Sequence, residues 1–241
     1  IDLNMYKERQ MKRRIDTLID RNRIKGYDEY IKAIKNDKNL FDEFVNYLTI
    51  NVSEFYRNPE QWKLLDKDIY PMLKERFKKP LKIWSAACST GEEPYSLAMV
   101  LSHHVPLSQI GILATDLDEN VIQKAKLGLY PERSLVEVPK DVKAKYFQKE
   151  EPFYKVNEEI KRTVTFKKHN LLKDAYESNF DLIVCRNVMI YFTEEAKDQI
   201  YDNFSKSLRP GGILFVGSTE QIFNPARYGF EVEDTFFYRK K

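Results

Sequence analysis

Apolar residues recur at helical intervals over about the first fifty positions of the chain. One buried stripe follows the i, i+4, i+7, i+8 spacing of a single helix and consists of Met11, Ile15, Leu18 and Ile19. Gly26 is expected to end this helix, and two more helices are predicted around residues 28–35 and 40–48. The pattern predicts an N-terminal all-α domain, which we place at residues 1–47.

Beyond this point the pattern changes to strands that alternate with helices. After a connecting helix near 60–77, strands are expected at 81–84, 110–115, 163–166, 180–185 and 213–217. Between them, helices are expected from Glu92 onward, over 119–127 and over 193–208. Alternation of this kind predicts a parallel α/β sheet with helices on both faces, a Rossmann-like fold that we place at residues 48–241. A last strand at 234–239 is expected to pair antiparallel with its neighbour.

The alternation pauses at about residues 130–162. Here residues 153–156, and the residues from Ile160 onward, have the composition of short antiparallel strands. We therefore expect a small antiparallel β subdomain inserted into the larger fold.

Composition excludes several classes of protein. Hydrophobic residues make up 42% of the 241 residues and aromatic residues 13%, which excludes disordered and fibrous chains. No apolar run approaches the roughly 18 to 20 residues of a membrane span, so no membrane insertion is expected. With two cysteines and three histidines, neither a disulfide framework nor a metal site is expected. We expect a reducing cytoplasm and, because the chain starts at Ile1, a longer parent protein.

Charge is unevenly distributed along the sequence. The formal net charge is +3, yet residues 1–25 carry eight basic and four acidic side chains, a local charge of +4. One flank of the first predicted helix holds Lys7, Arg13, Arg14 and Arg21, with no acid among them. Such a flank is either a solvated helix face or a docking surface for an acidic partner.

The loop after the first predicted strand is typical of a nucleotide-binding turn. Residues 85–91 end in Gly91, and a helix then opens with Glu92 and Glu93. Two acids at this point would repel a pyrophosphate, whereas they suit a cationic ligand. Asp116, at the tip of the next strand, occupies the place of a carboxylate that binds ribose hydroxyls. The alternative is an ordinary turn whose acids satisfy the helix dipole.

Further polar residues follow the next predicted strands. Asn170 and Leu171 come after one strand, and Arg186 and Asn187 after another. The carboxyl ends of parallel strands are where this architecture holds its ligands. Each asparagine alone is more typical of a turn, but together with Glu93 and Asp116 they indicate a cofactor made of a nucleoside and an amino acid.

Two more side chains are candidates for binding a carboxylate. Arg57 lies in a loop before the sheet, and a guanidinium binds carboxylates with two parallel hydrogen bonds. Tyr191, four residues past Asn187, is expected beside the same pocket.

These segments resemble one known family over about 190 residues, in order and at family spacing. Residues 84–96 (WSAACSTGEEPYS) and 185–192 (CRNVMIYF) closely resemble the bacterial chemotaxis receptor glutamate O-methyltransferases, the CheR family. The similarity extends to the segments 51–57, 114–116, 169–172 and 217–220. Ser53 stands where some relatives have threonine, and the hydroxyl is retained.

The resemblance implies a class I S-adenosylmethionine-dependent methyltransferase that forms methyl esters on glutamate side chains of chemoreceptors and releases S-adenosylhomocysteine. It implies that the cofactor contacts are Asn51, Ser53, Arg57, Glu93, Asp116, Asn170, Leu171, Arg186 and Asn187. We expect Arg57 and Tyr191 to orient the acceptor carboxylate, and Lys7, Arg13, Arg14 and Arg21 to dock the receptor. An acceptor glutamate, with an ordinary pKa of about 4.3, is already ionised at neutral pH, so no general base is required.

The expected partners are the cytoplasmic helical domains of methyl-accepting chemotaxis receptors, with the enzyme recruited as a monomer to receptor arrays at the inner face of the membrane. A nucleic-acid methyltransferase is the competing enzyme. The pI of about 8.6 and the lack of a second basic patch argue against it, so we expect no nucleic-acid partner. A module that binds the cofactor without catalysis is the third alternative.

Overall fold

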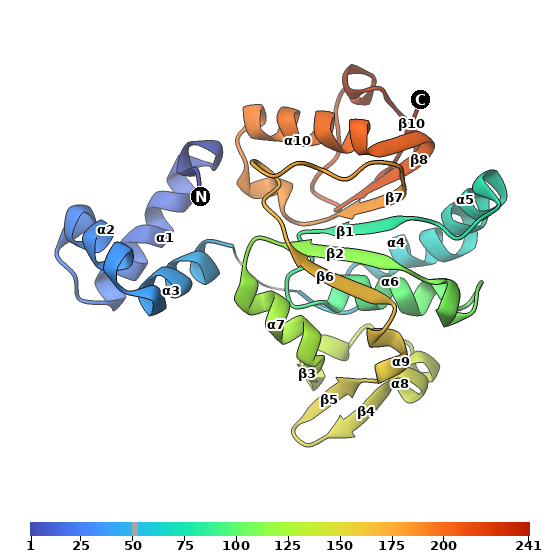
Figure 1. Cartoon of the computed structure of the whole chain (residues 1–241), viewed down its shortest axis with the longest axis horizontal. Helices are drawn as coiled ribbons and strands as arrows, with labels where there is room; N and C mark the ends of the chain where they lie inside the picture. Colours follow the sequence, from blue (N-terminus) through green and yellow to red (C-terminus); the bar gives the residue numbers. More distant parts are fainter. Residues whose placement is uncertain (50–52) are drawn as a thin grey trace.

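The computed structural model describes residues 1–49 and 53–241 and places a small helical domain beside a larger α/β domain (Figure 1). Asn51, one of the expected cofactor contacts, lies outside the described residues. The helices of the first domain are α1 (Glu8–Arg21), α2 (Gly26–Asn36) and α3 (Lys38–Leu48), with the 3-10 turn η1 (Leu3–Met5) before them. Their shared core includes Met11, Leu18 and Ile19 of the predicted stripe.

The expected end of the first helix was wrong. Helix α1 ends at Arg21, and Gly26 is the first residue of α2. Arg23, at a φ of 55°, adopts the left-handed conformation common just after the end of a helix, three residues before Gly26. The amide of Ile24 then donates to the Ile19 carbonyl at 3.1 Å and closes the last turn. The first helix therefore ends before it reaches Gly26, and the chain changes direction at Arg23.

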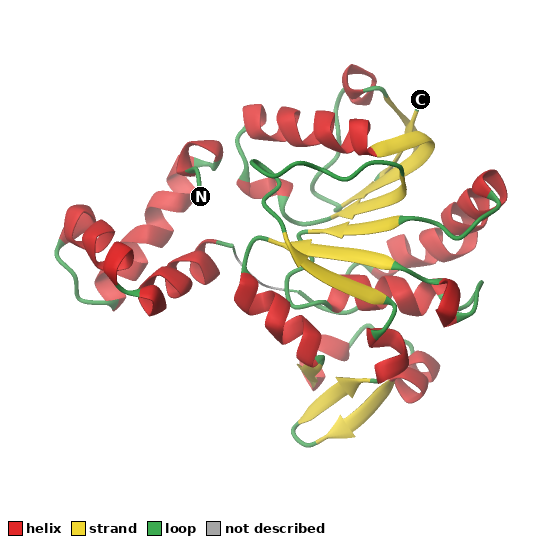
Figure 2. Ribbon diagram, viewed as in Figure 1, coloured by secondary structure: helices red, strands yellow, loops and turns green. Residues whose placement is uncertain are grey.

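The α/β domain is built on one seven-stranded sheet with the order β6-β2-β1-β7-β8-β10-β9 (Figure 2). Its strands are β1 (Ile83–Ala86), β2 (Ile112–Asp116), β6 (Val164–Lys168), β7 (Phe180–Cys185), β8 (Leu208–Val216), β9 (Phe230–Asp234) and β10 (Phe237–Lys240). The first five strands in this order pair in parallel, whereas β10 is antiparallel to both β8 and β9. The parallel sheet and its antiparallel last strand confirm the expected fold class.

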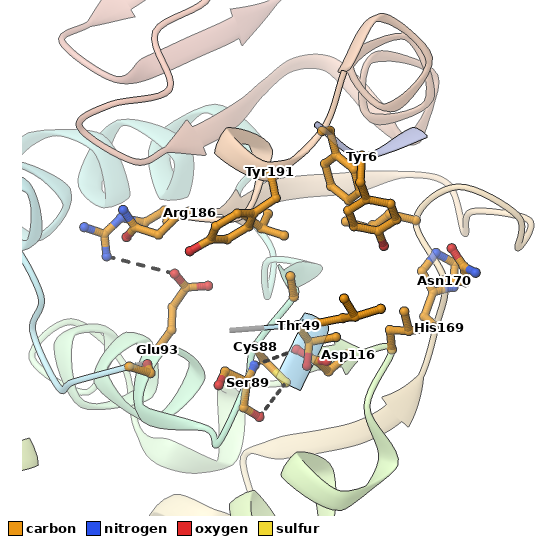
Figure 3. A pocket seen from close by; sticks show the side chains of 18 of the residues that line it. Tyr6, Thr49, Cys88, Ser89, Glu93, Asp116, His169, Asn170, Arg186 and Tyr191 are labelled. Atoms are coloured by element: carbon orange, nitrogen blue, oxygen red, sulfur yellow. Dashed lines mark hydrogen bonds and ion pairs between the residues drawn. The ribbon is translucent and has the colours of Figure 1, made fainter. Parts of the chain in front are cut away.

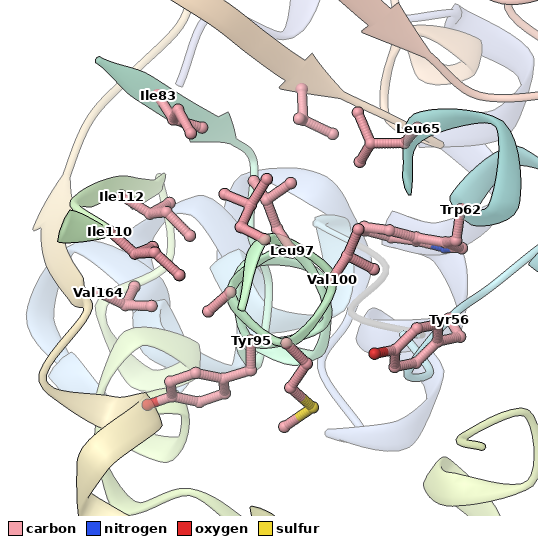
Figure 4. Packing of buried hydrophobic residues seen from close by; sticks show 14 of the residues in the cluster. Tyr56, Trp62, Leu65, Ile83, Tyr95, Leu97, Val100, Ile110, Ile112 and Val164 are labelled. Atoms are coloured by element: carbon pink, nitrogen blue, oxygen red, sulfur yellow. The ribbon is translucent and has the colours of Figure 1, made fainter. Parts of the chain in front are cut away.

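Helices cover both faces of the sheet. They are α4 (Pro59–Leu64), α5 (Tyr70–Phe77), α6 (Glu92–Leu101), α7 (Glu119–Leu127) and α10 (Glu194–Ser207), and the π turn η2 (Leu65–Ile69) joins α4 to α5. Neighbouring residues of β1 point to opposite faces: Ile83 packs with Leu97 and Val100 of α6 (Figure 4), while Trp84 packs with Phe204 of α10. Burial on both faces explains the continuous apolar runs of the central strands.

The expected β insertion is present between β2 and β6 of the large sheet. It contains β3 (Leu129–Pro131), β4 (Phe147–Glu150) and β5 (Phe153–Val156), paired antiparallel in the order β3-β5-β4, with α8 (Lys140–Tyr146) and α9 (Glu158–Lys161) beside them. The strand expected from Ile160 onward was wrong, because Ile160 lies in α9. Asn157 starts this helix by accepting a hydrogen bond from the Ile160 amide at 3.1 Å.

Candidate active site

A pocket opens at the carboxyl ends of the central parallel strands (Figure 3). It brings together all the expected cofactor residues that the structure describes, namely Ser53, Arg57, Glu93, Asp116, Asn170, Leu171, Arg186 and Asn187. Tyr191 lies on its rim with Arg57. These residues come from five separate chain segments, four of which lie at or just after the ends of the neighbouring strands β1, β2, β6 and β7.

The loop after β1 and the tip of β2 hold each other through backbone hydrogen bonds. The Ser89 amide donates to Asp116 Oδ2 at 2.8 Å, and the Asp118 amide donates to Asp116 Oδ1 at 3.0 Å. Burial raises the pKa of Asp116 to about 6, even though these amides favour its ionised form. A carboxylate has about four lone-pair sites, so Asp116 keeps acceptor capacity for ligand hydroxyls.

Gly91 is required by both its conformation and its surroundings. Its φ is +95°, and a Cβ atom at this position would lie 2.8 Å from Cβ of Ala125 on α7. The Tyr130 hydroxyl, which donates to the Thr90 carbonyl at 2.7 Å, would lie 3.0 Å from the same atom. The loop is therefore packed directly against α7 and the start of the insertion.

The two acids at the start of α6 have different surroundings. Glu92 is buried behind the loop, where its side chain accepts hydrogen bonds from Thr90 and Ser53. Glu93 lines the pocket, accepts a hydrogen bond from the Ser85 hydroxyl at 2.8 Å and lies 3.9 Å from Arg186 Nη1. Burial raises the pKa of Glu93 to about 7, an effect that the charge of Arg186 opposes. Glu93 is thus the acid that can meet a cationic ligand, and Glu92 holds the loop.

Arg186 connects the end of β7 to the segment that carries Arg57. Its Nη2 atom donates to the Arg57 carbonyl and to Gln61 Oε1, each at 2.7 Å. The guanidinium carbon also lies 4.8 Å from the centre of the Phe215 ring. We infer from these contacts that Arg186 positions the Arg57 segment in addition to lining the pocket.

Glu220 is a site residue that the sequence did not assign. It is buried, and it accepts hydrogen bonds from the amides of Asn187 at 2.5 Å and Met189 at 2.7 Å. Asn187 has a φ of 59°, a strained conformation that these bonds help to hold. Glu220 lies in the segment 217–220 that carries part of the family resemblance, and the signal that could have identified it is an acid four residues after the last parallel strand.

The rim of the pocket is electropositive around Tyr191. Burial raises the pKa of the Tyr191 phenol, while the charges of Arg14 and Arg57 lower it. The phenol therefore stays protonated at neutral pH and can donate a hydrogen bond to an anion. Arg57 is held in place at its backbone, where its carbonyl accepts from the Trp62 indole at 2.9 Å.

The four basic residues expected to dock a receptor are not equivalent. Arg14 Nε donates to the Tyr47 carbonyl at 2.8 Å, and its guanidinium lies over the Tyr47 ring at 4.5 Å. Arg21 pairs with Glu43 of α3 at 3.2 Å. Lys7 and Arg13 are exposed. Half of the set therefore also serves the packing of the helical domain.

The helical domain supplies part of the pocket wall. Tyr6, Leu48 and Thr49 line the pocket together with residues of the α/β domain. Tyr6 was not among the expected site residues, and no local pattern distinguishes it from other tyrosines. Among residues 1–49 and 53–241, no cluster of metal-ligating side chains occurs, and no helix has the length and apolarity to cross a bilayer.

Comparison with known proteins is consistent along the whole chain. The model of the CheR methyltransferase all-alpha domain matches residues 1–49, and that of the CheR methyltransferase SAM-binding domain matches residues 51–236. The chemotaxis protein methyltransferase of Listeria monocytogenes is 45% identical over 240 residues, covering 100% of this chain and 92% of the relative. That of Borreliella burgdorferi is 33% identical over 235 residues, covering 92% of this chain and 83% of the relative. Chemotaxis protein methyltransferase 2 of Vibrio cholerae is 31% identical, covering 90% and 77% respectively.

Proposed function

Since the chain belongs to the CheR family, and is therefore an S-adenosylmethionine-dependent methyltransferase of chemotaxis, we propose that it methylates glutamate side chains in the cytoplasmic helical domains of chemoreceptors. The observation that carries this proposal is the division of charge in the pocket. The buried carboxylate of Asp116 and the partly buried carboxylate of Glu93 lie on its floor, and Arg57 and Tyr191 lie together on its rim.

The floor suits the methyl donor. S-adenosylmethionine supplies an electrophilic methyl group when bound, and it carries a positively charged sulfonium and an amino group. Glu93 and Asp116 provide carboxylates for such a cationic nucleoside, and neither is fully committed to protein donors. The residues present therefore fit this cofactor, with Ser53, Asn170, Leu171 and Asn187 as further contacts.

The rim suits an anionic acceptor. Arg57 offers a guanidinium, which can bind a carboxylate with two hydrogen bonds, and the protonated Tyr191 phenol can donate another. A receptor glutamate is already ionised at neutral pH, so these two side chains have to orient it and do not have to deprotonate it. Glu93, which lines the same pocket, lies 3.9 Å from Arg186, whose positive charge reduces repulsion of the incoming carboxylate. The main catalytic contribution of the protein is then alignment in a water-poor pocket.

The helical domain suits the receptor. Arg14 is close enough to influence the Tyr191 phenol, so the basic flank of α1 adjoins the catalytic rim. A receptor helix bound along Lys7, Arg13, Arg14 and Arg21 would present its glutamates to Arg57. One chain supplies both the pocket and this flank, which supports action as a monomer. The proposed substrate, a cytoplasmic receptor domain, would place this action in the cytoplasm, at receptor arrays.

The test is incubation of the protein with S-adenosylmethionine labelled in its methyl group, together with receptor-containing membranes and total nucleic acid. We expect base-labile label on receptor glutamates. Arg57→Ala and Tyr191→Phe should each reduce the rate at least tenfold, whereas Lys63→Ala, on the exposed surface of α4, should not. Label in nucleic acid, or cofactor binding without any transfer, would contradict the proposal.

A further inference from the structure

The residues that join η1 to α1 run along the edge of the pocket. The Thr193 amide donates to the Met5 carbonyl at 3.0 Å, and the Lys7 amide donates to the Tyr191 carbonyl at 2.9 Å. Between these bonds, Tyr6 and Phe192 form an antiparallel β-bridge, and their ring centres are 4.9 Å apart. Residues 5–7 thus pair like a short strand with the loop that carries the catalytic-rim tyrosine.

A second contact joins the helical domain to the opposite side of the pocket. Asn46 of α3 donates to Asp118 Oδ2 at 3.1 Å, and the Asp118 amide in turn donates to Asp116. The helical domain therefore touches both the loop of Tyr191 and the loop of Asp116. Both loops line the cofactor pocket, through Tyr191 and Phe192 on one loop and Asp116 on the other.

Tyr6 extends from the first contact into the pocket. Figure 3 shows its ring over the cavity, on the side where Asp116, His169 and Asn170 lie. Burial and the charge of Asp116 raise the pKa of Tyr6 to about 12, so the side chain is a neutral aromatic wall. A flat aromatic side chain beside a ribose-binding carboxylate is the kind of surface on which a nucleobase packs.

We propose that Tyr6 binds the nucleoside part of the cofactor. Cofactor binding would thereby stabilise the contact between the helical domain and the α/β domain. This inference rests on the proposed function, because it assigns a further residue to the same cofactor site. Thermodynamic coupling is reciprocal. If the bound cofactor stabilises the contact between the two domains, then formation of that contact must raise the affinity for the cofactor. A receptor that holds the helical domain in place would then also raise cofactor affinity.

The first test measures the dissociation constant of S-adenosylhomocysteine by calorimetry. Tyr6→Ala should raise it about tenfold, because the aromatic surface is lost, whereas Tyr6→Phe should stay within about threefold of the wild type. Tyr27→Ala is the matched control, since Tyr27 is an exposed tyrosine of α2 in the same domain. An unchanged constant for a folded Tyr6→Ala variant would overturn the assignment.

The second test measures amide hydrogen exchange with and without S-adenosylhomocysteine. The Lys7 and Thr193 amides, which cross between the two domains, should exchange at least severalfold more slowly when the ligand is bound. In Tyr6→Ala, at saturating ligand, this slowing should be lost at Lys7. Equal exchange at Lys7 in free and bound wild-type protein would overturn the coupling.

The two proposals fail in different ways. If the wild-type protein does not bind S-adenosylhomocysteine, the proposed function fails. If it binds the ligand normally and the Tyr6 variants match the wild type, the further inference alone fails.

Discussion

The floor of the pocket and the basic flank of α1 are both charged, yet the protein treats their charges in opposite ways. On the floor, Asp116 and Arg186 are buried, Glu93 is mostly shielded from water, and all three have defined protein partners. On the flank, Lys7 and Arg13 are exposed, and the nearby Arg21 pairs with Glu43 across the surface of the helical domain. Buried charges are strongly coupled to their surroundings, whereas exposed ones are screened by water and salt. Substitutions on the floor should therefore have large, pH-dependent effects, and substitutions on the flank small, salt-dependent ones.

The largest effect is expected for Glu220, whose carboxylate accepts hydrogen bonds from the loop after β7. Glu220→Ala leaves the amides of Asn187, Met189 and Gly217 without their acceptor, and each such loss costs about 1 to 3 kcal/mol. The free energy of unfolding should fall by about 3 kcal/mol in urea titrations. Glu194→Ala, at an exposed position on α10, is the control and should change it by less than about 0.5 kcal/mol. Equal stability of the two variants would remove Glu220 from the site.

Asp116 should show the next largest effect, on cofactor binding. Asp116→Ala removes the carboxylate expected to bind ribose hydroxyls, and such charged hydrogen bonds contribute about 1.5 to 3 kcal/mol. Calorimetry with S-adenosylhomocysteine should show a correspondingly weaker affinity, while Asp141→Ala on the exposed face of α8 should bind normally. Undiminished affinity in a folded Asp116→Ala variant contradicts the assignment.

Glu93 should give the floor a characteristic pH dependence. Its pKa is about 7 in the folded protein and near 4.5 when unfolded, so over this window the native state holds a proton that the unfolded chain has released. Stability of the ligand-free protein should therefore decline as pH rises from about 4.5 to about 7, and Asp116 adds a decline of the same sign up to about pH 6. Glu93→Gln should make this decline shallower in urea titrations, whereas Glu75→Gln, on the exposed surface of α5, should leave it unchanged. If Glu93→Gln leaves the pH profile of stability unchanged, the pocket does not raise the pKa of Glu93.

The smallest effect is expected on the flank. Lys7→Ala combined with Arg13→Ala should raise KM for the receptor about two- to fivefold, with unchanged cofactor affinity. The defect should shrink as salt rises, because the wild-type contact is itself screened over about 8 to 10 Å. Arg14 is left in place because it also holds Tyr47, so that its loss would disturb packing. Equal KM at low salt would identify the flank as a solvated helix face.

Local sequence patterns could predict much of the fold and part of the site. The central strands, the parallel sheet and the acids at strand ends follow from local patterns, and Glu93 and Asp116 could be assigned from the strand–loop–helix order. The errors at Gly26 and Ile160 arose where two local rules compete: a glycine can end or begin a helix, and an apolar residue after asparagine suits a strand or a capped helix.

Contacts between distant segments could not be predicted from local patterns. Tyr6 contacts Phe192, and Arg186 contacts Gln61 over a separation of 125 residues. Such pairs depend on how domains and loops are packed in three dimensions. The residues themselves carry no periodic signal that would indicate their partners.

The bonds between Arg186 and the segment of Arg57 also have a consequence for how the protein is made. The Arg186 guanidinium donates to the Arg57 carbonyl, 129 positions earlier in the sequence. Strand β1 likewise pairs on one side with β7, which is translated much later. A ribosome adds roughly 5 to 20 residues per second, so on the order of ten seconds separates the two halves of this contact during synthesis. In the later part of that interval, after Asp116 has been made, the nascent chain has the acids of the floor but no closed pocket. The methyl donor can therefore stabilise the finished protein, but it cannot guide the early steps of its folding on the ribosome.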